Sequence, residues 1–126
     1  MNILLWVLQV LLAAAFFAHG WLMLSPPASM SEQINAAIAP ALRLFIGVAE
    51  VAAAFGLIVP GAARIQPWWV PWAAAGLMIV MICATIFHIV RAEYSSAMTT
   101  AVLLVIATFV AYMRWKVAPI RPRTVA

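Results

Sequence analysis

The sequence predicts an all-α integral membrane protein, with one four-helix transmembrane bundle over residues 1–126 and both termini in the cytoplasm. The first reason is composition: 68% of the 126 residues are hydrophobic and 8% are charged, whereas roughly 25% of residues are charged in soluble domains. The second reason is that the apolar residues form four segments, each near or above the roughly 18–20 residues that cross a bilayer. The third is that most basic residues lie on the side of the predicted bundle that carries the two termini.

The first helix is expected over about residues 3–24. Pro26 and Pro27 end it, because proline cannot continue the helical hydrogen-bond ladder. No lysine or arginine precedes Leu42, and the apolar segment is longer than that of a signal peptide, so the sequence predicts a retained helix.

The connection over residues 25–41 is the longest one in the predicted bundle. Met30–Ile38 has the pattern of a short amphipathic helix. Ser29 or Ser31 would be its N-cap, and Glu32 would lie in its first turn, where a carboxylate is favourable.

The other three helices are expected over about residues 42–59, 72–90 and 97–115. Pro60 and Gly61 end the second helix. Trp68, Trp69 and Trp72 mark one membrane interface before the third, because tryptophan favours the headgroup level. The loop between the third and fourth helices is short, so these two helices are expected to be antiparallel neighbours.

The distribution of basic residues predicts the orientation. Two basic residues, Arg43 and Arg91, lie on the face opposite the termini. Five lie on the face of the termini: Arg64, Arg114, Lys116, Arg121 and Arg123. Such an excess is typical of the cytoplasmic side, which predicts a multi-pass protein of the inner (plasma) membrane. Because these charges flank apolar spans, they indicate a lipid bilayer and no nucleic acid as partner.

Glu50 is the most informative residue, because it lies in the middle of an apolar span. A carboxylate at that depth costs several kcal/mol unless it is protonated, paired or hydrated. Other polar groups can be placed in the same outer half of the bundle. The candidate ligand-binding residues are Glu50, His88, Arg91, His19, Arg43 and Gly47.

Helical phase predicts how these residues meet. Arg43, Gly47 and Glu50 recur at intervals of four and three residues and therefore share one helix face. On the third helix, one face carries Met81, Ala84, Thr85, His88 and Arg91. If the two faces meet, they form a small polar pocket that opens toward the outer leaflet.

Two interpretations of Glu50 remain open. It either binds a ligand and handles protons, or it is a structural carboxyl bonded to backbone, to Arg43 or to His88. Arg91 and Glu93 are two residues apart, so they are not expected to pair on a helix. The single cysteine, Cys83, is expected to be a small, buried apolar packing residue.

The sequence contains no pattern that indicates a self-sufficient enzyme. No histidine or glutamate spacing matches a metal-ligand motif, so no metal site is expected. Phosphate loops, serine-hydrolase elbows and heme cysteine motifs are also absent from the sequence.

The order of several short motifs resembles that of the DoxX-like family, small four-helix membrane proteins common in bacteria. The motifs cover the second and third helices well and the first more loosely. They are Leu42–Glu50, Gly56–Pro60, Ala73–Leu77, Met81, Ala84, Phe87-His88, Arg91–Glu93 and Phe17–Gly20. The resemblance by motif extends to Gly47, Glu50, His88, Arg91 and Glu93.

The resemblance implies the fold and two kinds of role. Its relatives include a subunit of a thiosulfate:quinone oxidoreductase, and a eukaryotic branch resembles a chaperone for receptor assembly. We therefore expect a membrane subunit, associated with membrane redox, that binds a lipophilic small molecule in the polar pocket, with a quinone as one candidate. The alternative is a non-catalytic assembly protein that forms a homo-oligomer or docks on another membrane protein, with Glu50 as a structural group.

Overall fold

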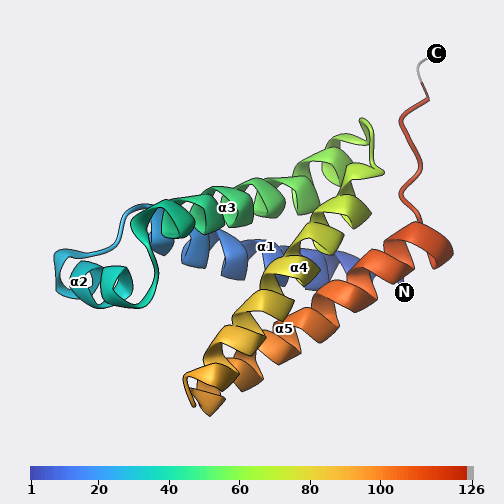
Figure 1. Ribbon diagram of the computed structural model, residues 1–126. Helices are drawn as coiled ribbons and strands as arrows, with labels where there is room; N and C mark the ends of the chain where they lie inside the picture. Colours follow the sequence, from blue (N-terminus) through green and yellow to red (C-terminus); the bar gives the residue numbers. More distant parts are fainter. Residues whose placement is uncertain (125–126) are drawn as a thin grey trace.

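Five α-helices and one π-helical turn make up the computed structural model, which describes residues 1–124 (Figure 1). The long helices are α1 (Asn2–Leu24), α3 (Pro40–Ala63), α4 (Trp69–Val90) and α5 (Tyr94–Tyr112). The short helix α2 (Ala28–Ala37) links α1 to α3, and α5 continues into the π-helix η1 (Met113–Val117). Helices account for 83% of the structure, and no strand occurs among residues 1–124.

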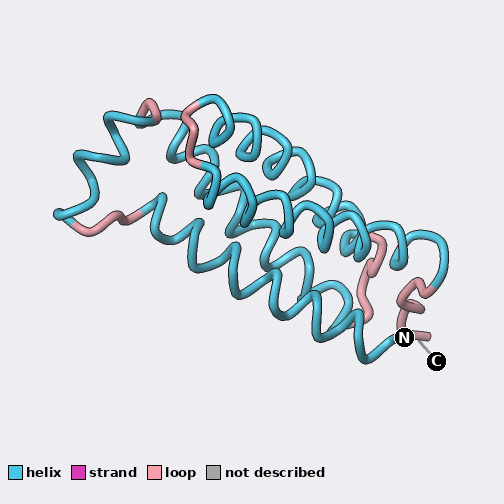
Figure 2. The backbone as a smooth tube through the Cα atoms, turned by 90° about the horizontal axis from the view of Figure 1, so that it is seen from below, coloured by secondary structure: helices cyan, strands magenta, loops and turns pink. Residues whose placement is uncertain are grey.

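The long helices are arranged as two closely packed pairs, α1 with α3 and α4 with α5, and α3 also packs against α4. In Figure 1 the two pairs cross, lying nearest each other toward the termini and diverging toward α2 and the α4–α5 turn. Figure 2 shows the two chain ends at one end of the bundle and α2 at the other. The expected antiparallel pairing of the third and fourth spans is confirmed.

The core lies where the two pairs meet. All four long helices contribute to it, and the buried side chains are Leu12, Phe16, Leu57, Ala74, Leu77, Met81, Ala107 and Val110. Outside this core the helices carry many large exposed apolar side chains, such as Phe45, Ile79 and Val105. These side chains are not covered by the rest of the chain, and a lipid bilayer is the surrounding that keeps them away from water.

Four helical segments are long and apolar enough to cross a membrane: Asn2–Leu24, Pro40–Ala63, Trp69–Val90 and Tyr94–Val117. This confirms the expected four-helix membrane architecture. The chain is therefore a multi-pass membrane protein embedded in a lipid bilayer.

The prediction that Pro60 ends the second span is wrong, because α3 continues through Pro60 to Ala63. Proline removes one helical donor, and a membrane helix tolerates this loss when its neighbours compensate. Arg64 then ends α3 in the left-handed conformation, with a φ of 57°.

The predicted serine cap of α2 is also wrong. The helix begins at Ala28, directly after Pro27, and no side chain caps it. The Pro27 carbonyl accepts the N–H groups of Met30 and Ser31 at 2.9 and 3.0 Å. The proline that stops α1 therefore also starts α2, two residues earlier than expected.

Two glycines allow α1 and α3 to approach closely. A Cβ atom on Gly20 would lie 3.0 Å from the Gly47 carbonyl oxygen and 3.1 Å from Glu50 Cβ. A Cβ atom on Gly47 would lie 3.0 Å from the Gly20 carbonyl oxygen and 2.8 Å from Leu24 Cγ. The backbones therefore meet where only glycine fits, as small residues do in membrane helix pairs.

Candidate functional site

A histidine–carboxylate pair lies beside this glycine contact. Glu50 on α3 is 1% exposed, and its Oε2 lies 2.6 Å from His19 Nδ1 on α1. The His19 side chain is 52% exposed, so it can be reached from outside the chain. The His19–Glu50 pair thus connects a buried acid to the surface of the bundle.

Arg43 continues the contact between α1 and α3 toward α2. Its Nη1 donates to the Met23 carbonyl, and its Nε donates to Asn35 Oδ1 on α2 at 3.1 Å. The Met23 carbonyl is one of the last on α1, and such carbonyls have no partner within their helix. Arg43 therefore ties together the ends of three helices near the His19–Glu50 pair.

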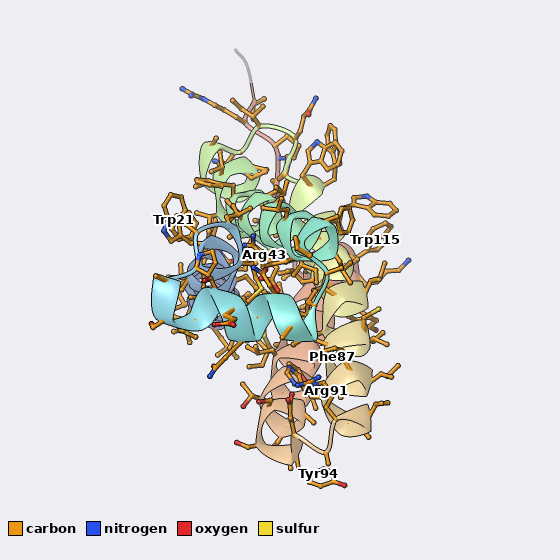
Figure 3. The ribbon with its side chains drawn as sticks, turned by 60° about the vertical axis from the view of Figure 1, so that its left-hand side comes forward. Trp21, Arg43, Phe87, Arg91, Tyr94 and Trp115 are labelled. Atoms are coloured by element: carbon orange, nitrogen blue, oxygen red, sulfur yellow. The ribbon has the colours of Figure 1, made fainter. Side chains whose placement is uncertain are left out.

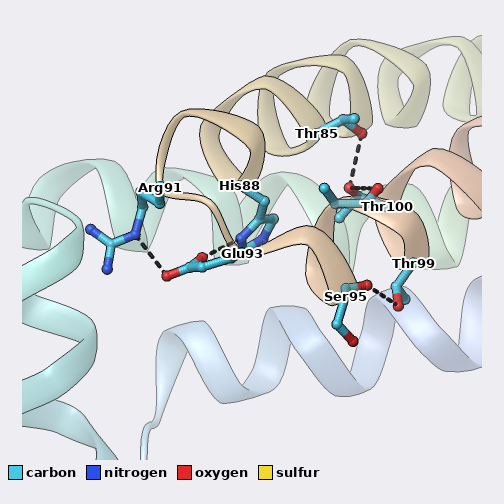
Figure 4. Close-up of polar contacts among 8 residues, drawn as sticks. Thr85, His88, Arg91, Glu93, Ser95, Thr99 and Thr100 are labelled. Atoms are coloured by element: carbon cyan, nitrogen blue, oxygen red, sulfur yellow. Dashed lines mark hydrogen bonds and ion pairs between the residues drawn. The ribbon is translucent and has the colours of Figure 1, made fainter.

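The other candidate residues form a second group at the α4–α5 turn (Figure 4). His88 Nδ1 lies 2.6 Å from Glu93 Oε2, and Arg91 Nε donates to Glu93 Oε1 at 2.9 Å. The expectation that Arg91 and Glu93 do not pair is wrong. It assumed a helix, but α4 ends at Val90 and Ala92 is left-handed with a φ of 57°, which turns the two side chains toward each other.

Charge and hydrogen bonding shift the pKa of Glu93 in this group. The hydrogen bond from His88 lowers the pKa of Glu93 most, and the bond from Arg91 lowers it further. A lowered carboxyl pKa stabilises the folded turn above the ordinary carboxyl range, and that stabilisation is lost as the pH falls through the lowered pKa. Glu93 is therefore ionised at neutral pH.

A hydroxyl pair joins α4 to α5 one turn further into the bundle. Thr85 Oγ1 donates to Thr100 Oγ1 at 2.9 Å and is also 2.7 Å from the Met81 carbonyl. The polar face predicted for the third span thus bonds with α5. The polar face of the second span bonds instead with α1, through Glu50.

The structure therefore divides the candidate residues between the two helix pairs. His19, Arg43, Gly47 and Glu50 lie on α1 and α3, whereas His88 and Arg91 lie at the α4–α5 turn. Figure 3 shows Arg43 beside α2 and Arg91 on the other helix pair. Within residues 1–124, no hydrogen bond joins the His19–Glu50 pair to His88, Arg91 or Glu93.

A third polar group, at the end of the bundle with the termini, was not singled out from the sequence. Arg114 in η1 is 3% exposed and donates from Nε to Gln9 Oε1 at 2.6 Å. Gln9 is fully buried and donates to the Leu57 carbonyl at 2.7 Å. Gln9 is a polar residue inside a predicted apolar span, which is the sequence signal that could have marked this group.

Neither a metal site nor a disulfide accompanies these groups in the described part of the chain. No cluster of three or more histidine, cysteine, aspartate or glutamate side chains could hold a metal ion among residues 1–124. Cys83 is exposed on α4, so the expectation that it is a buried packing residue is wrong. The chemistry that these residues offer is hydrogen bonding and proton exchange.

Comparisons with known proteins identify the family. A search of curated proteins and a search of solved structures each gave no match. The family model described as the DoxX-like family matches residues 7–110, which covers α3 and α4 fully, most of α1 and α5, and both histidine–carboxylate groups. The chain belongs to the DoxX-like family.

Proposed function

We propose that this DoxX-like protein is a membrane subunit that binds a lipophilic small molecule with hydrogen-bonding oxygen atoms, such as a quinone, at the His19–Glu50 pair. One observation carries the proposal. Glu50 is 1% exposed, and its carboxylate lies 2.6 Å from a histidine whose side chain is 52% exposed. Intramembrane acids are usually functional, and this one is in contact with a half-exposed histidine.

The pair has the chemistry for proton exchange with such a ligand. His19 uses Nδ1 for Glu50, and its Nε2 makes no hydrogen bond within residues 1–124. When Nδ1–H donates to the carboxylate, Nε2 is an acceptor; in the protonated ring, both nitrogens donate. His19 can therefore take a proton from a ligand hydroxyl or give one to a ligand carbonyl, while Glu50 stabilises the charged imidazole.

The neighbouring candidate residues have supporting roles in this proposal. Gly47 allows α3 to approach α1, and Arg43 holds the ends of both helices. We assign no direct ligand contact to His88 and Arg91, because both are bonded to Glu93.

The rival proposal is an assembly protein, either a homo-oligomer or a chaperone-like partner of another membrane protein. The observation that favours it is that Glu50 already has a bonding partner within the chain. In this proposal the His19–Glu50 pair only holds α1 against α3, and the exposed part of His19 contacts another protein.

Substitutions of Glu50 distinguish the two proposals. Glu50→Gln preserves size and a hydrogen bond to His19 but removes the negative charge that stabilises the protonated imidazole. We expect it to leave thermal stability near that of the wild type and to weaken binding of a short-chain ubiquinone analogue about tenfold. Glu50→Leu removes the interhelical bond and should lower stability by about 1 kcal/mol. Thermal unfolding in detergent and native mass spectrometry with the added analogue measure both quantities.

His88→Gln is the matched control, because it removes a histidine of the other polar group. It should leave binding of the analogue unchanged. If Glu50→Gln binds the analogue as tightly as the wild type does, the ligand proposal is wrong and the assembly proposal stands. The same conclusion follows if neither the wild type nor any variant binds the analogue.

We further propose that the protein lies in the inner (plasma) membrane with its termini in the cytoplasm. The proposal is supported by the five basic residues at the end of the bundle with the termini, against Arg43 and Arg91 at the α2 end. An excess of this kind orients short loops toward the cytoplasm.

Cysteine labelling tests this orientation in a Cys83→Ala background. An impermeant thiol reagent should label Gln33→Cys, on the exposed surface of α2, in intact spheroplasts. Thr124→Cys should be labelled only after lysis. The reverse pattern of labelling would show the opposite orientation.

A further inference from the structure

A cavity of about 470 Å³ lies at the end of the bundle that carries the termini, at the opposite end from α2. It is formed by the first turns of α1, the end of α3 and the segment that follows η1. Its walls include Asn2, Trp6, Arg64, Ala118 and Arg121. Two arginines and one tryptophan thus surround one space at the level where the apolar spans end.

The segment after η1, residues 118–124, is held in place across this cavity. Arg64 Nε donates to the Arg121 carbonyl at 3.1 Å, and the Arg123 N–H donates to the Arg64 carbonyl at 2.9 Å. Ile120 packs against Gly61, where a Cβ atom would lie 2.7 Å from Ile120 Cδ1. These contacts place the backbone of Arg121 opposite the end of α3, so the cavity is part of the fold.

A third arginine lies directly behind the cavity wall. Arg114 Nη1 donates to Asn2 Oδ1 at 2.7 Å and to the Ala118 carbonyl at 3.1 Å, and both of these residues line the cavity. Arg114 Nη2 is buried and has no hydrogen-bond partner among residues 1–124. The guanidinium also lies 5.4 Å from the Trp6 ring centroid.

Among residues 1–124, no acidic side chain lies at this end to compensate the positive charge. The three acidic residues of the chain are Glu32 in α2, Glu50 in the middle of α3 and Glu93 at the α4–α5 turn. A buried charge is unfavourable unless an opposite charge is nearby. The cavity therefore presents a positive potential that no acidic side chain of residues 1–124 balances.

We propose that this cavity binds a phosphate group, supplied by the headgroup of an anionic phospholipid. Guanidinium groups bind phosphate through paired, charge-assisted hydrogen bonds, and Arg64 and Arg121 are the donors that line the cavity. Arg114 adds positive charge from behind Asn2 and Ala118. Trp6 supplies an apolar wall at the headgroup level, where tryptophan is favoured. A free phosphate ion offers the same chemistry and is the second source.

The test compares two tail arginines in the full chain. Arg121→Gln removes a donor of the cavity but preserves the carbonyl that accepts from Arg64. Arg123→Gln removes the same charge from the same segment outside the cavity wall. Native mass spectrometry of each protein in detergent, with equal amounts of phosphatidylglycerol and phosphatidylcholine, measures which lipid is retained. A further variant, Ala62→Leu, changes another residue of the cavity wall and narrows the cavity without a change of charge.

The wild type should retain phosphatidylglycerol preferentially, and Arg121→Gln should weaken that retention about tenfold. Ala62→Leu should weaken it as well, and Arg123→Gln should leave it near the wild-type level. Competition by inorganic phosphate at equal concentration would assign the site to the free ion. Equal losses in Arg121→Gln and Arg123→Gln would mean non-specific attraction to the basic end, and equal retention in all four proteins would also overturn the proposal.

Discussion

Replacement of Gly47 by alanine is expected to destabilise the protein by about 1–3 kcal/mol, the usual cost of overpacking, and to break the His19–Glu50 hydrogen bond. The added Cβ would lie 2.8 Å from Leu24 Cγ and 3.0 Å from the Gly20 carbonyl oxygen. The Leu24 side chain can move, but the Gly20 carbonyl belongs to the α1 backbone. Helices α1 and α3 must therefore separate, and the 2.6 Å bond one turn away lengthens with them.

Thermal unfolding in detergent measures the loss of stability, and the NMR signals of the His19 ring report its bond to Glu50. Gly76→Ala is the matched control, because a Cβ at Gly76 meets no atom within 4 Å. That substitution should stabilise α4 by about 0.5–1 kcal/mol, since alanine favours the helix over glycine. A Gly47→Ala protein with wild-type stability and an unchanged His19 spectrum would show that the two backbones do not meet there.

The spans and their order could be predicted from the sequence because membrane length and hydropathy are local properties. The apolar segments around Glu50 and His88 are each long enough to cross a bilayer. The buried face of α3 could also be predicted, since Gly47, Glu50 and Ala54 recur at helical intervals and all three are buried. A short connection likewise predicted that α4 and α5 are neighbours.

The partner of Glu50 could not be predicted, because it depends on which helix faces α3. The helical periodicity of the sequence places Glu50 on one face of α3. It does not determine whether that face contacts His88 on α4 or His19 on α1. The choice depends on the fit of Gly20 against Gly47, two residues 27 positions apart whose contact no local pattern encodes.

The pairing of Arg91 with Glu93 could not be predicted for a different reason. Residues two apart diverge on a helix, and the end of α4 at Val90 is what brings them together. Helix ends in apolar segments are poorly marked, because hydropathy continues past them. The continuation of α3 past Pro60 could not be predicted either, because a membrane helix tolerates a proline when its neighbours compensate for the lost donor.

Replacement of Gln9 by leucine is expected to lower stability by about 2–3 kcal/mol, because it leaves the buried Nε of Arg114 without a partner and removes a hydrogen bond to the Leu57 carbonyl. Gln9 accepts from Arg114 Nε at 2.6 Å and donates to the Leu57 carbonyl at 2.7 Å. Leucine preserves the approximate size of the side chain, but it can neither accept from Arg114 nor donate to the Leu57 carbonyl. Arg114 already has one buried nitrogen without a partner, so the loss of the Nε bond makes its burial still less favourable.

Thermal unfolding in detergent measures this effect, and Gln33→Leu is its control. Gln33 lies exposed on α2, and the same substitution there should change stability by less than about 0.5 kcal/mol.

The double variant Gln9→Leu with Arg114→Met tests the cause of the destabilisation. It removes the charge together with its partner, and a buried polar network replaced by apolar groups is often close to neutral. Recovery of most of the lost stability in the double variant would show that the unpaired Arg114 charge causes the destabilisation. An additive loss would show that Gln9 stabilises the bundle through the Leu57 carbonyl alone, and that Arg114 stays compensated without it.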